Sequence, residues 1–318
     1  MSQIPRIAII GAGAAGIAAA SLLQKASISV AIFEKSRGLG GRCSTRRFDN
    51  FTIDHGAQYF TLRNEEFKAA AIQACGEDLL PILAPILNEK DCEIPARSPR
   101  YYHRAGNSQL IRKLAKDLTI RTETTVTQQL LASSLSKDYE LIISTAPLPQ
   151  TLQLAGIHDL NSCNFCPCLC LILIYRGNWL GKSKNAYAYS ISNPSSILAW
   201  SACENHKIGR IPNGFTALVI HASQDFSTQY LESPPEEWAP QLQKAAEHLW
   251  EISPRNLQIS QPHRWRYARN IGPILEPKLP SNWLLAGDSL CESRVESAWL
   301  NGRKIAHQLL QQIQNTPQ

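Results

Sequence analysis

The residues best suited to bind a charged ligand lie near the start of the chain, between Gly11 and Gly16 (Gly-Ala-Gly-Ala-Ala-Gly). They follow the apolar stretch Ile7–Ile10 and precede an alanine-rich segment. A buried strand, a Gly-x-Gly-x-x-Gly turn and a helix together form a binding site for a dinucleotide pyrophosphate. Gly11 permits the turn, Gly13 lets the phosphates approach the backbone, and Gly16 lets the helix pack against the strand. The start of the helix then offers unpaired N–H groups and a positive dipole end to the anion.

The neighbouring segments have the pattern that this turn requires. Residues 16–26 are rich in strong helix formers and lack proline, which predicts a helix. Residues 28–33 are mostly apolar, as the second strand of a parallel sheet should be. Glu34 ends that strand where an acidic residue that hydrogen-bonds an adenosine ribose is expected. No Lys-Ser or Lys-Thr follows the third glycine, so a nucleoside-triphosphate P-loop is disfavoured.

The later pattern predicts a dinucleotide domain that is interrupted by a second domain. Strands are expected over residues 139–144 and 282–286, and a last helix over residues 295–313. Between them, residues 157–262 contain repeated strand-like stretches and a long amphipathic helix over 235–252. The expected fold class is α/β: a discontinuous Rossmann-like domain with a second, β-rich α+β substrate domain. We expect residues 1–75, 106–156 and 263–318 in the first domain and residues 76–105 and 157–262 in the second.

Shorter elements are expected within each part. In the first domain, the pattern predicts helices over 64–75 and 108–118 and an extended segment over 119–128. Residues 77–105, which fall mostly in the second domain, contain several prolines and look irregular. In the second domain, the pattern predicts strands over 168–175, 186–191, 197–202 and 215–222.

Length and composition indicate a globular protein without a nucleic-acid or membrane partner. The 318 residues are enough for two domains, with 44% hydrophobic and 18% charged residues. The net charge of +6 is spread along the chain, without a basic block that would indicate nucleic acid. No apolar run approaches the roughly 20 residues that span a bilayer. The chain enters the nucleotide fold within a few residues, which leaves no room for a signal peptide, so we expect a cytoplasmic protein.

Four of the nine cysteines lie close together in the sequence, at Cys163, Cys166, Cys168 and Cys170. A metal or iron–sulfur site is one interpretation. In a strand, however, the last three would share one face and spread over about 13 Å, too far for one tetrahedral metal. Buried free thiols that pack as small hydrophobes are the favoured interpretation.

Several further motifs narrow the family. They are Glu34-Lys-Ser-Arg37, Gly40-Gly41-Arg42, Gly56-Ala-Gln-Tyr59, Ser192-Asn-Pro194, Leu218-Val-Ile-His221, Tyr230-Leu-Glu232, Trp265-Arg266 and Gly287-Asp288. Together they resemble the two-dinucleotide-binding-domain flavoproteins of the amine oxidase superfamily, and within it the renalase-like oxidoreductases. The likeness covers nearly the whole chain.

The resemblance implies FAD, held without a covalent bond in the Rossmann-like domain. Gly11, Gly13, Ala15 and Gly16 would face the pyrophosphate, and Glu34 the adenosine ribose. Arg42 would lie along the pyrophosphate and ribityl chain, where a guanidinium can neutralise phosphate charge. Gln58 and Tyr59 would lie by the isoalloxazine ring, Asp288 by the ribityl hydroxyls and the backbone of Val126 by adenine. Lys35, Gly41, Gly287 and Val295 complete the implied set of cofactor contacts.

The resemblance also implies a reaction. The substrate would be an NAD(P)H isomer reduced at ring position 2 or 6, which passes a hydride to flavin N5, and O2 would reoxidise the flavin and give H2O2. The candidate catalytic residues are Tyr59, His221 and Arg266. The candidate walls of the substrate slot are Tyr59, Tyr187, Trp265 and Tyr267, and the candidate polar contacts are Gln58, Asn193, His221, Arg264 and Arg266. For His221, a satisfied core histidine is the favoured interpretation, and the two arginines could equally be salt-bridged structural residues.

Two alternatives remain open at the level of the sequence. One is an amine oxidase or desaturase-type flavoenzyme that acts on a hydrophobic amine or an isoprenoid. The other is a flavin-retaining protein without turnover, in which Cys43 near the cofactor would sense redox state.

Overall fold

A five-stranded parallel sheet carries the glycine-rich turn. The computed structural model describes residues 5–158, 165–178, 185–272 and 277–315, and Cys163 lies outside this part of the chain. The strand order is β15-β9-β1-β2-β8, and every neighbouring pair is parallel. The strands are β1 (Ile7–Ile10), β2 (Val30–Phe33), β8 (Ile120–Arg121), β9 (Leu141–Ser144) and β15 (Trp283–Leu285). The short, almost fully apolar strands β1 and β2 are typical of a sheet that is covered on both faces.

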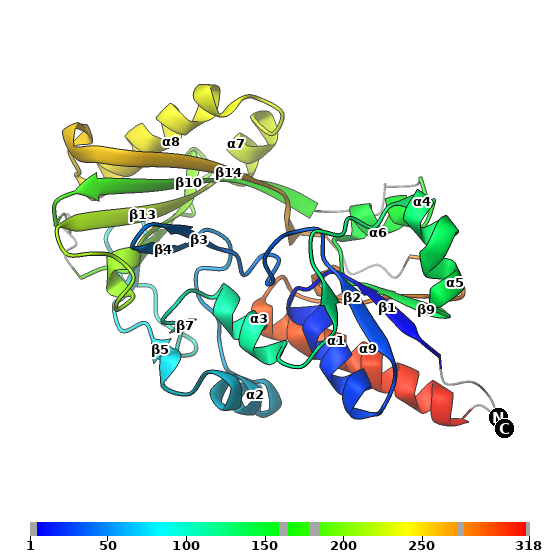
Figure 1. The fold of residues 1–318 in the computed structure, drawn as a ribbon. Helices are drawn as coiled ribbons and strands as arrows, with labels where there is room; N and C mark the ends of the chain where they lie inside the picture. The colour runs from blue at the N-terminus through cyan, green and yellow to red at the C-terminus, as the bar shows by residue number, and fades with distance from the viewer. Residues whose placement is uncertain (1–4, 159–164, 179–184, 273–276, 316–318) are drawn as a thin grey trace.

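Helices cover both faces of this sheet. One face packs against α1 (Ala14–Lys25) and α9 (Val295–Asn315), which lie side by side in Figure 1, with α2 (Glu65–Cys75) and α3 (Ser108–Leu114) completing that layer. The other face packs against α4 (Gln128–Leu130), a π-helical turn (Leu131–Leu135), α5 (Ser136–Asp138) and α6 (Leu148–Leu154). The last helix therefore returns to the first one, which closes the discontinuous dinucleotide domain.

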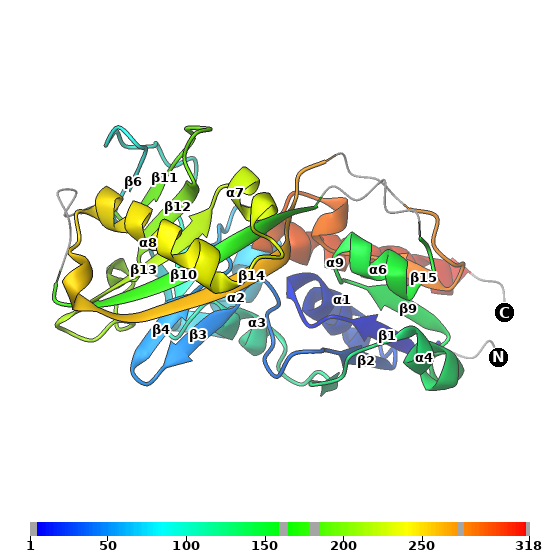
Figure 2. The ribbon, with the colours of Figure 1, turned by 90° about the horizontal axis from the view of Figure 1, so that it is seen from above.

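A six-stranded sheet forms the other end of the molecule, as Figures 1 and 2 show. Its order is β14-β10-β13-β12-β11-β6. The strands are β6 (Ile86–Leu87), β10 (Phe165–Arg176), β11 (Ala188–Ser190), β12 (Leu198–Cys203), β13 (Phe215–Ala222) and β14 (Leu257–Asn270). Odd-numbered residues of β10 from Leu169 to Tyr175 pack under α8 (Pro235–Trp250), next to α7 (Gln224–Gln229).

A hairpin packs against the six-stranded sheet. Strands β3 (Thr45–Phe48) and β4 (Phe51–Asp54) pair antiparallel and pack against the opposite face of β10, at Cys170, Ile172 and Ile174. A separate pair is formed by β5 (Leu79–Pro81) and β7 (Tyr101–His103). The residues that follow β4 are thus held between the two sheets, and they include the Gly-Ala-Gln-Tyr motif.

The expected fold class is confirmed, and several elements differ from their expected bounds. The helix predicted over 108–118 ends at Leu114, because Asp117 adopts a left-handed backbone with φ of 69°. The extended segment predicted over 119–128 contains only the two-residue strand β8. The long strand β14 was not predicted, since Pro262 and alternating arginines obscure it; proline is tolerated there because β14 is an edge strand. Residues 263–270, expected in the dinucleotide domain, therefore belong to the six-stranded sheet.

The clustered cysteines that the structure describes lie on β10. Cys166 and Cys170 are buried, and a register irregularity separates Cys166 from Cys168. Burial raises the pKa of the Cys168 thiol to about 12, and that of Cys170 well above its ordinary value. Within the described residues, no group of three or more His, Cys, Asp or Glu side chains is arranged to hold a metal ion.

Candidate functional site

The start of α1 offers an uncapped, unobstructed anion site. Gly13 is the N-cap residue of this helix, no side chain caps it, and its first turn contains no acidic residue. A Cβ added at Gly16 would lie 2.1 Å from the carbonyl oxygen of Gly11, so only glycine allows this approach of helix and strand. A Cβ added at Gly13 would meet nothing within 4 Å. The backbone at Gly13 therefore faces open space, as a pyrophosphate site requires.

Glu34 is fixed beside this turn. Its buried carboxylate accepts hydrogen bonds from the Ala12 N–H at 2.9 Å and from the Ser36 N–H at 2.8 Å, one at each oxygen. The Gly40 N–H donates to the Ala12 carbonyl at 3.0 Å, which holds the Gly-Gly-Arg segment on the same turn. Each carboxylate oxygen has a second lone pair, which could accept a hydrogen bond from a ribose hydroxyl.

Arg42 and Asp288 meet across the site. The guanidinium donates to both carboxylate oxygens of Asp288, and it also donates to the Ala268 carbonyl at 3.2 Å. Asp288 is nearly buried, whereas 29% of the Arg42 side chain is exposed. The Gly287 N–H donates to Asn301 Oδ1 at 2.8 Å, so the C-terminal helix positions the Gly-Asp pair. Because part of the Arg42 side chain is open to solvent, a phosphate could replace the carboxylate as its partner.

The loop from Asp54 to Gln58 is held by the six-stranded sheet. The carbonyl of His55 accepts from Trp265 Nε1 at 3.0 Å and from His221 Nε2 at 3.2 Å. The ring of His55 stacks on Trp265, with ring centroids 5.4 Å apart, and meets the edge of His263 at 4.6 Å. The Ala57 N–H donates to the carbonyl of Arg42 at 2.8 Å, which links this loop to the cofactor side.

The three histidines around this loop are neutral at neutral pH. Burial, then the neighbouring His263, lowers the pKa of His55 to about 3. Burial is also the largest cause that lowers the pKa of His221 and of His263 to about 4. His55 Nδ1 and Gln58 Oε1 are buried and find no hydrogen-bond partner among the residues that the structure describes. Unpartnered buried polar atoms are unfavourable, so the loop is suited to a further polar ligand.

Under this loop lies a buried charge cluster, which consists of Asp54, Glu204, Lys207 and Arg210. All four side chains are fully buried. Lys207 Nζ lies 3.1 Å from Asp54 and 2.5 Å from Glu204, and Arg210 Nη1 lies 2.5 Å from Asp54 and 3.0 Å from Glu204. Burial alone would raise the pKa of Asp54, but Arg210 and Lys207 outweigh it, and the pKa falls to about 2. This cluster leaves no signal in the sequence, because no local motif connects residues 54 and 210.

An aromatic wall borders Gln58. Tyr59 packs against Trp200 with centroids 6.0 Å apart, and Trp200 against Tyr187 at 6.1 Å. The Tyr187 hydroxyl donates to the Gln58 carbonyl at 3.2 Å. The structure therefore brings together three of the predicted slot residues, Gln58, Tyr59 and Tyr187, and adds Trp200.

Other predicted residues lie apart from this wall. Arg266 forms an exposed ion pair with Glu232, and Arg264 donates to the Ser233 carbonyl at 2.7 Å. Both alternate with Trp265 along β14 and so point to the opposite face of the strand. Asn193 is exposed and accepts the Ser195 N–H of its own turn.

The remaining predicted residues lie at the edges of the site. Lys35 is exposed just beyond β2, and Val126 is buried with Phe33 on the far side of the sheet. Tyr267 packs edge-on against Phe165, over which Arg42 lies. Gly41 lies against Gly13, and Val295 begins α9.

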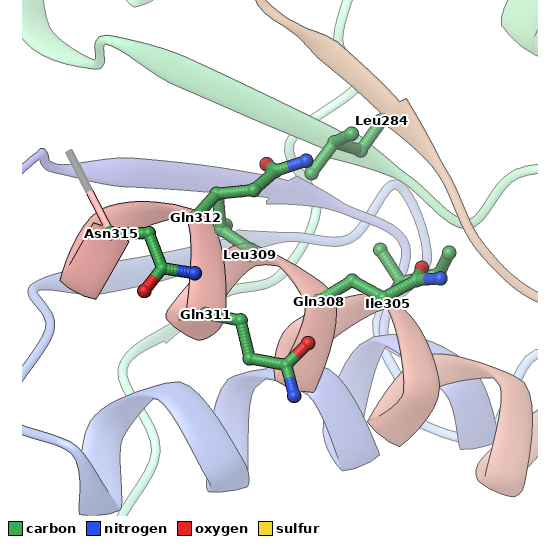
Figure 3. Close-up of a pocket in the computed structure, with 7 residues that line it drawn as sticks. All are labelled: Leu284, Ile305, Gln308, Leu309, Gln311, Gln312 and Asn315. Atoms are coloured by element: carbon green, nitrogen blue, oxygen red, sulfur yellow. The ribbon is translucent and has the colours of Figure 1, made fainter.

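A groove of about 730 Å³ lies elsewhere, between α9 and the edge strand β15 (Figure 3). Its lining is aliphatic and amide: Leu284, Ile305, Gln308, Leu309, Gln311, Gln312 and Asn315. The helical residues begin at Ile305, about 15 Å along the helix from its start at Val295. With no titratable side chain, this groove offers no redox or acid–base chemistry.

Comparisons with known proteins agree with this geometry. The family model of an NAD(P)-binding Rossmann-like domain matches residues 9–71. A zeta-carotene-forming phytoene desaturase of Myxococcus xanthus is 47% identical over 55 residues, which are 17% of this chain and 11% of that enzyme. The matched segment is thus a small part of the curated relative.

Solved structures match over nearly the whole chain. Reduced UDP-galactopyranose mutase superposes with a TM-score of 0.77 at 10% identity and covers 97% of this chain and 96% of that one. Putrescine oxidase with redesigned cofactor binding superposes with a TM-score of 0.67 at 10% identity and covers 97% and 99%. Among the described helices, none has both the length and the apolar character to cross a bilayer. The chain therefore has an NAD(P)-binding Rossmann-like domain at its start and an overall fold similar to that of UDP-galactopyranose mutase and putrescine oxidase.

Proposed function

We propose that this protein is an FAD-dependent oxidoreductase, and more specifically an oxidase of dihydronicotinamide dinucleotide isomers that uses O2 as acceptor. The observation that carries the cofactor assignment is the convergence of four separate segments on the start of α1. These are the open backbone at Gly13, the fixed carboxylate of Glu34, the guanidinium of Arg42 and the carboxylate of Asp288. The likeness to redox and cofactor-binding proteins over the whole chain supports the same assignment.

Each of these groups has a defined task toward the cofactor. The N–H groups at the start of α1 would bind the diphosphate. The Arg42 guanidinium would give up Asp288 as its partner, bind a phosphate instead and neutralise its charge. Asp288 and Glu34 would accept hydrogen bonds from the ribityl and ribose hydroxyls. Gln58 has a buried, unpartnered oxygen that can accept an N–H from the cofactor ring. Bound FAD would supply a hydride acceptor that O2 can reoxidise.

The substrate end of the site supports hydride removal without a strong base. Loss of hydride from a dihydropyridine leaves an aromatic cation, so no proton must be abstracted. The candidate bases near the loop fit this chemistry, because His55, His221 and His263 have pKa values of about 3 to 4. Such weak bases would contribute little to proton abstraction at neutral pH. Tyr59 and Trp200 offer flat surfaces against which a pyridine ring can be held.

A second candidate function, amine oxidation or isoprenoid desaturation, has specific support. The 47% identity to a phytoene desaturase favours it, as does the fold of putrescine oxidase. For an amine substrate, the unfavourable observation is Arg100, whose guanidinium lies 5.6 Å from the Tyr59 ring and would repel a cation. The redox-sensor alternative has less support. Burial raises the pKa of the Cys43 thiol to about 12, whereas the thiolate is the reactive form.

Anaerobic stopped-flow absorbance separates these functions. The purified yellow protein is mixed with 2- and 6-dihydro isomers of NAD(P)H, ordinary NADH, a polyamine panel and a solubilised carotene precursor. We expect the flavin to bleach rapidly with the isomers and hardly at all with ordinary NADH. Bleaching by amines or carotene precursors alone would assign the second function, and colourless protein that takes up no FAD would refute both.

A further inference from the structure

Two arginines on the segments that follow and pair with Tyr59 have guanidinium groups without a carboxylate partner. We call Arg63 and Arg100 the arginine rim. In the part of the chain that the structure describes, no ion pair involves either of them, whereas Arg42, Arg210 and Arg266 are each paired. Two guanidinium groups held on one short segment without a counter-charge leave uncompensated positive charge, which favours an external anion.

The backbone holds the rim against the aromatic wall. The Phe60 N–H donates to the Tyr101 carbonyl at 2.9 Å, and the Tyr101 N–H donates to the Phe60 carbonyl at 2.8 Å. This two-hydrogen-bond bridge places Arg100 next to Tyr59, where its guanidinium carbon lies 5.6 Å from the ring centroid. Arg63 Nε donates to the hydroxyl of Ser98 at 2.9 Å, which ties it to the same segment.

The character of each arginine suits capture of an anion. Arg100 is half-buried and stacked on an aromatic ring, so its side chain is already ordered. Arg63 is exposed and can adjust to an incoming group. Trp200 packs against Tyr59, and its buried Nε1 donor has no acceptor among the described residues. Planar guanidinium groups bind phosphate through two parallel hydrogen bonds, and they do so better than lysines.

We infer that the arginine rim binds the diphosphate of a dinucleotide substrate, while the nicotinamide ring lies toward Tyr59 and Trp200. Arg264 and Arg266, which the sequence offers as polar contacts of the substrate, are engaged by Ser233 and Glu232 on the opposite face of β14. The inference rests on the proposed function and specifies it: the substrate is a phosphate-bearing dihydropyridine, and the rim sets its affinity rather than its chemistry.

The test compares Arg63→Gln, Arg100→Gln and the double variant with Arg255→Gln, an exposed arginine in the turn before β14. Flavin reduction is followed anaerobically against the concentration of a 6-dihydro dinucleotide and of the corresponding 6-dihydronicotinamide riboside, which lacks phosphate. We expect the apparent Kd of the dinucleotide to rise about tenfold for each lost arginine, with the limiting reduction rate within about twofold of the parent. The riboside should react identically with all variants, and Arg255→Gln should match the parent.

Two further readouts separate the outcomes. Higher ionic strength should weaken binding of the dinucleotide but not of the riboside, because salt screens the interaction between exposed charges. If the dinucleotide reduces the flavin and its Kd is the same in the double variant, the rim is not the phosphate site, and the proposed function stands. If no isomer reduces the flavin, binding of ADP-ribose is measured by calorimetry. Loss of that binding in the double variant supports the rim as an anion site without the proposed activity, whereas unchanged binding refutes it.

Discussion

Two groups of charges border the loop from Asp54 to Gln58, and they are built differently. Arg42 and Asp288 form one ion pair at the cofactor side, with nearly a third of the Arg42 side chain exposed. The buried charge cluster of Asp54, Glu204, Lys207 and Arg210 lies on the other side, with no exposed side-chain surface. The ion pair of Arg42 and Asp288 is partly exposed to solvent. In the buried charge cluster, each carboxylate contacts both cations.

The difference indicates that the Arg42–Asp288 pair belongs to a binding site, whereas the buried charge cluster has a structural role; we call this cluster the structural joint. Buried charges are tolerated only when paired and hydrogen-bonded, and Asp54 also accepts the Asn107 N–H at 2.9 Å and the Thr45 hydroxyl at 2.7 Å. Any change of partner there would leave a charge uncompensated. Arg42 can change partners at low cost because water and the carbonyl of Ala268 remain available. We therefore expect ligand exchange at Arg42 and a fixed geometry at the cluster.

The largest effect is expected from Lys207→Met, which breaks the joint. Two buried carboxylates would then share one guanidinium, and removal of one partner of a buried ion pair typically costs about 3–5 kcal/mol. Urea unfolding followed by circular dichroism measures the loss. Adding Glu204→Gln restores neutrality and should recover part of it. As a control, Glu140→Gln breaks the exposed pair with Arg6 and should leave the unfolding midpoint unchanged. If the Lys207→Met protein unfolds at the same urea concentration as the parent, the buried charge cluster does not have this structural role.

The second effect concerns the binding side, where Gly13→Val should spare the fold and abolish cofactor binding. The backbone of Gly13 is extended, and a Cβ there meets nothing within 4 Å, so the cofactor-free protein can accept valine. A branched side chain in this space would displace the diphosphate, and we expect FAD affinity to fall at least about 100-fold, or about 2.7 kcal/mol. Flavin content and the urea midpoint are measured together. Gly16→Ala is the matched opposite, since its Cβ would lie 2.1 Å from Gly11 and should destabilise the fold itself.

This contrast also explains what could be predicted from the sequence. The turn, Glu34 and the parallel strands follow from local spacing, because a strand, a glycine turn and a helix are contiguous in the chain. The Gly287-Asp288 motif marks the return of the last helix, and Asn301 holds it. The charge cluster could not be predicted, since Asp54 and Arg210 meet only through tertiary packing. The same reason hid the arginine rim and the true neighbours of Arg264 and Arg266.

The third effect is a loss of stability in acid, which comes from the histidines around the loop from Asp54 to Gln58. An unfolded histidine titrates near pH 6.5, whereas His55, His221 and His263 titrate at about 3 to 4 in the folded protein. Below about pH 6.5 the unfolded chain therefore binds more protons, so acidification favours unfolding. We expect a loss of at least about 2 kcal/mol between about pH 7.5 and pH 5, measured by urea unfolding.

The same titration distinguishes the histidines from the cluster. The lowered pKa of Asp54 contributes stability that is present above its unfolded value near 3.9 and is lost only as the pH falls toward about 2. The window from about pH 6.5 to 4 thus belongs to the buried histidines, and His103, whose pKa burial also lowers to about 4, shares it with these three. His263→Phe keeps an aromatic edge against His55 and Trp265 and should flatten the dependence there. If the pH dependence of stability is the same in this variant as in the parent, His263 does not contribute to it.

The smallest effect separates charge from geometry at the two guanidinium groups. Arg42→Lys keeps the positive charge but loses the fork that meets both oxygens of Asp288, and by the same argument those of a phosphate. We expect FAD affinity, measured by flavin fluorescence quenching, to fall about tenfold, with the urea midpoint unchanged. Arg210→Lys should do the reverse. It would lose the hydrogen bonds to the carbonyls of His103 and Arg104, so the midpoint should drop, while protein that remains folded should bind FAD as before. If both variants lose stability and FAD together, the two groups of charges act as one unit, and the division between binding site and joint fails.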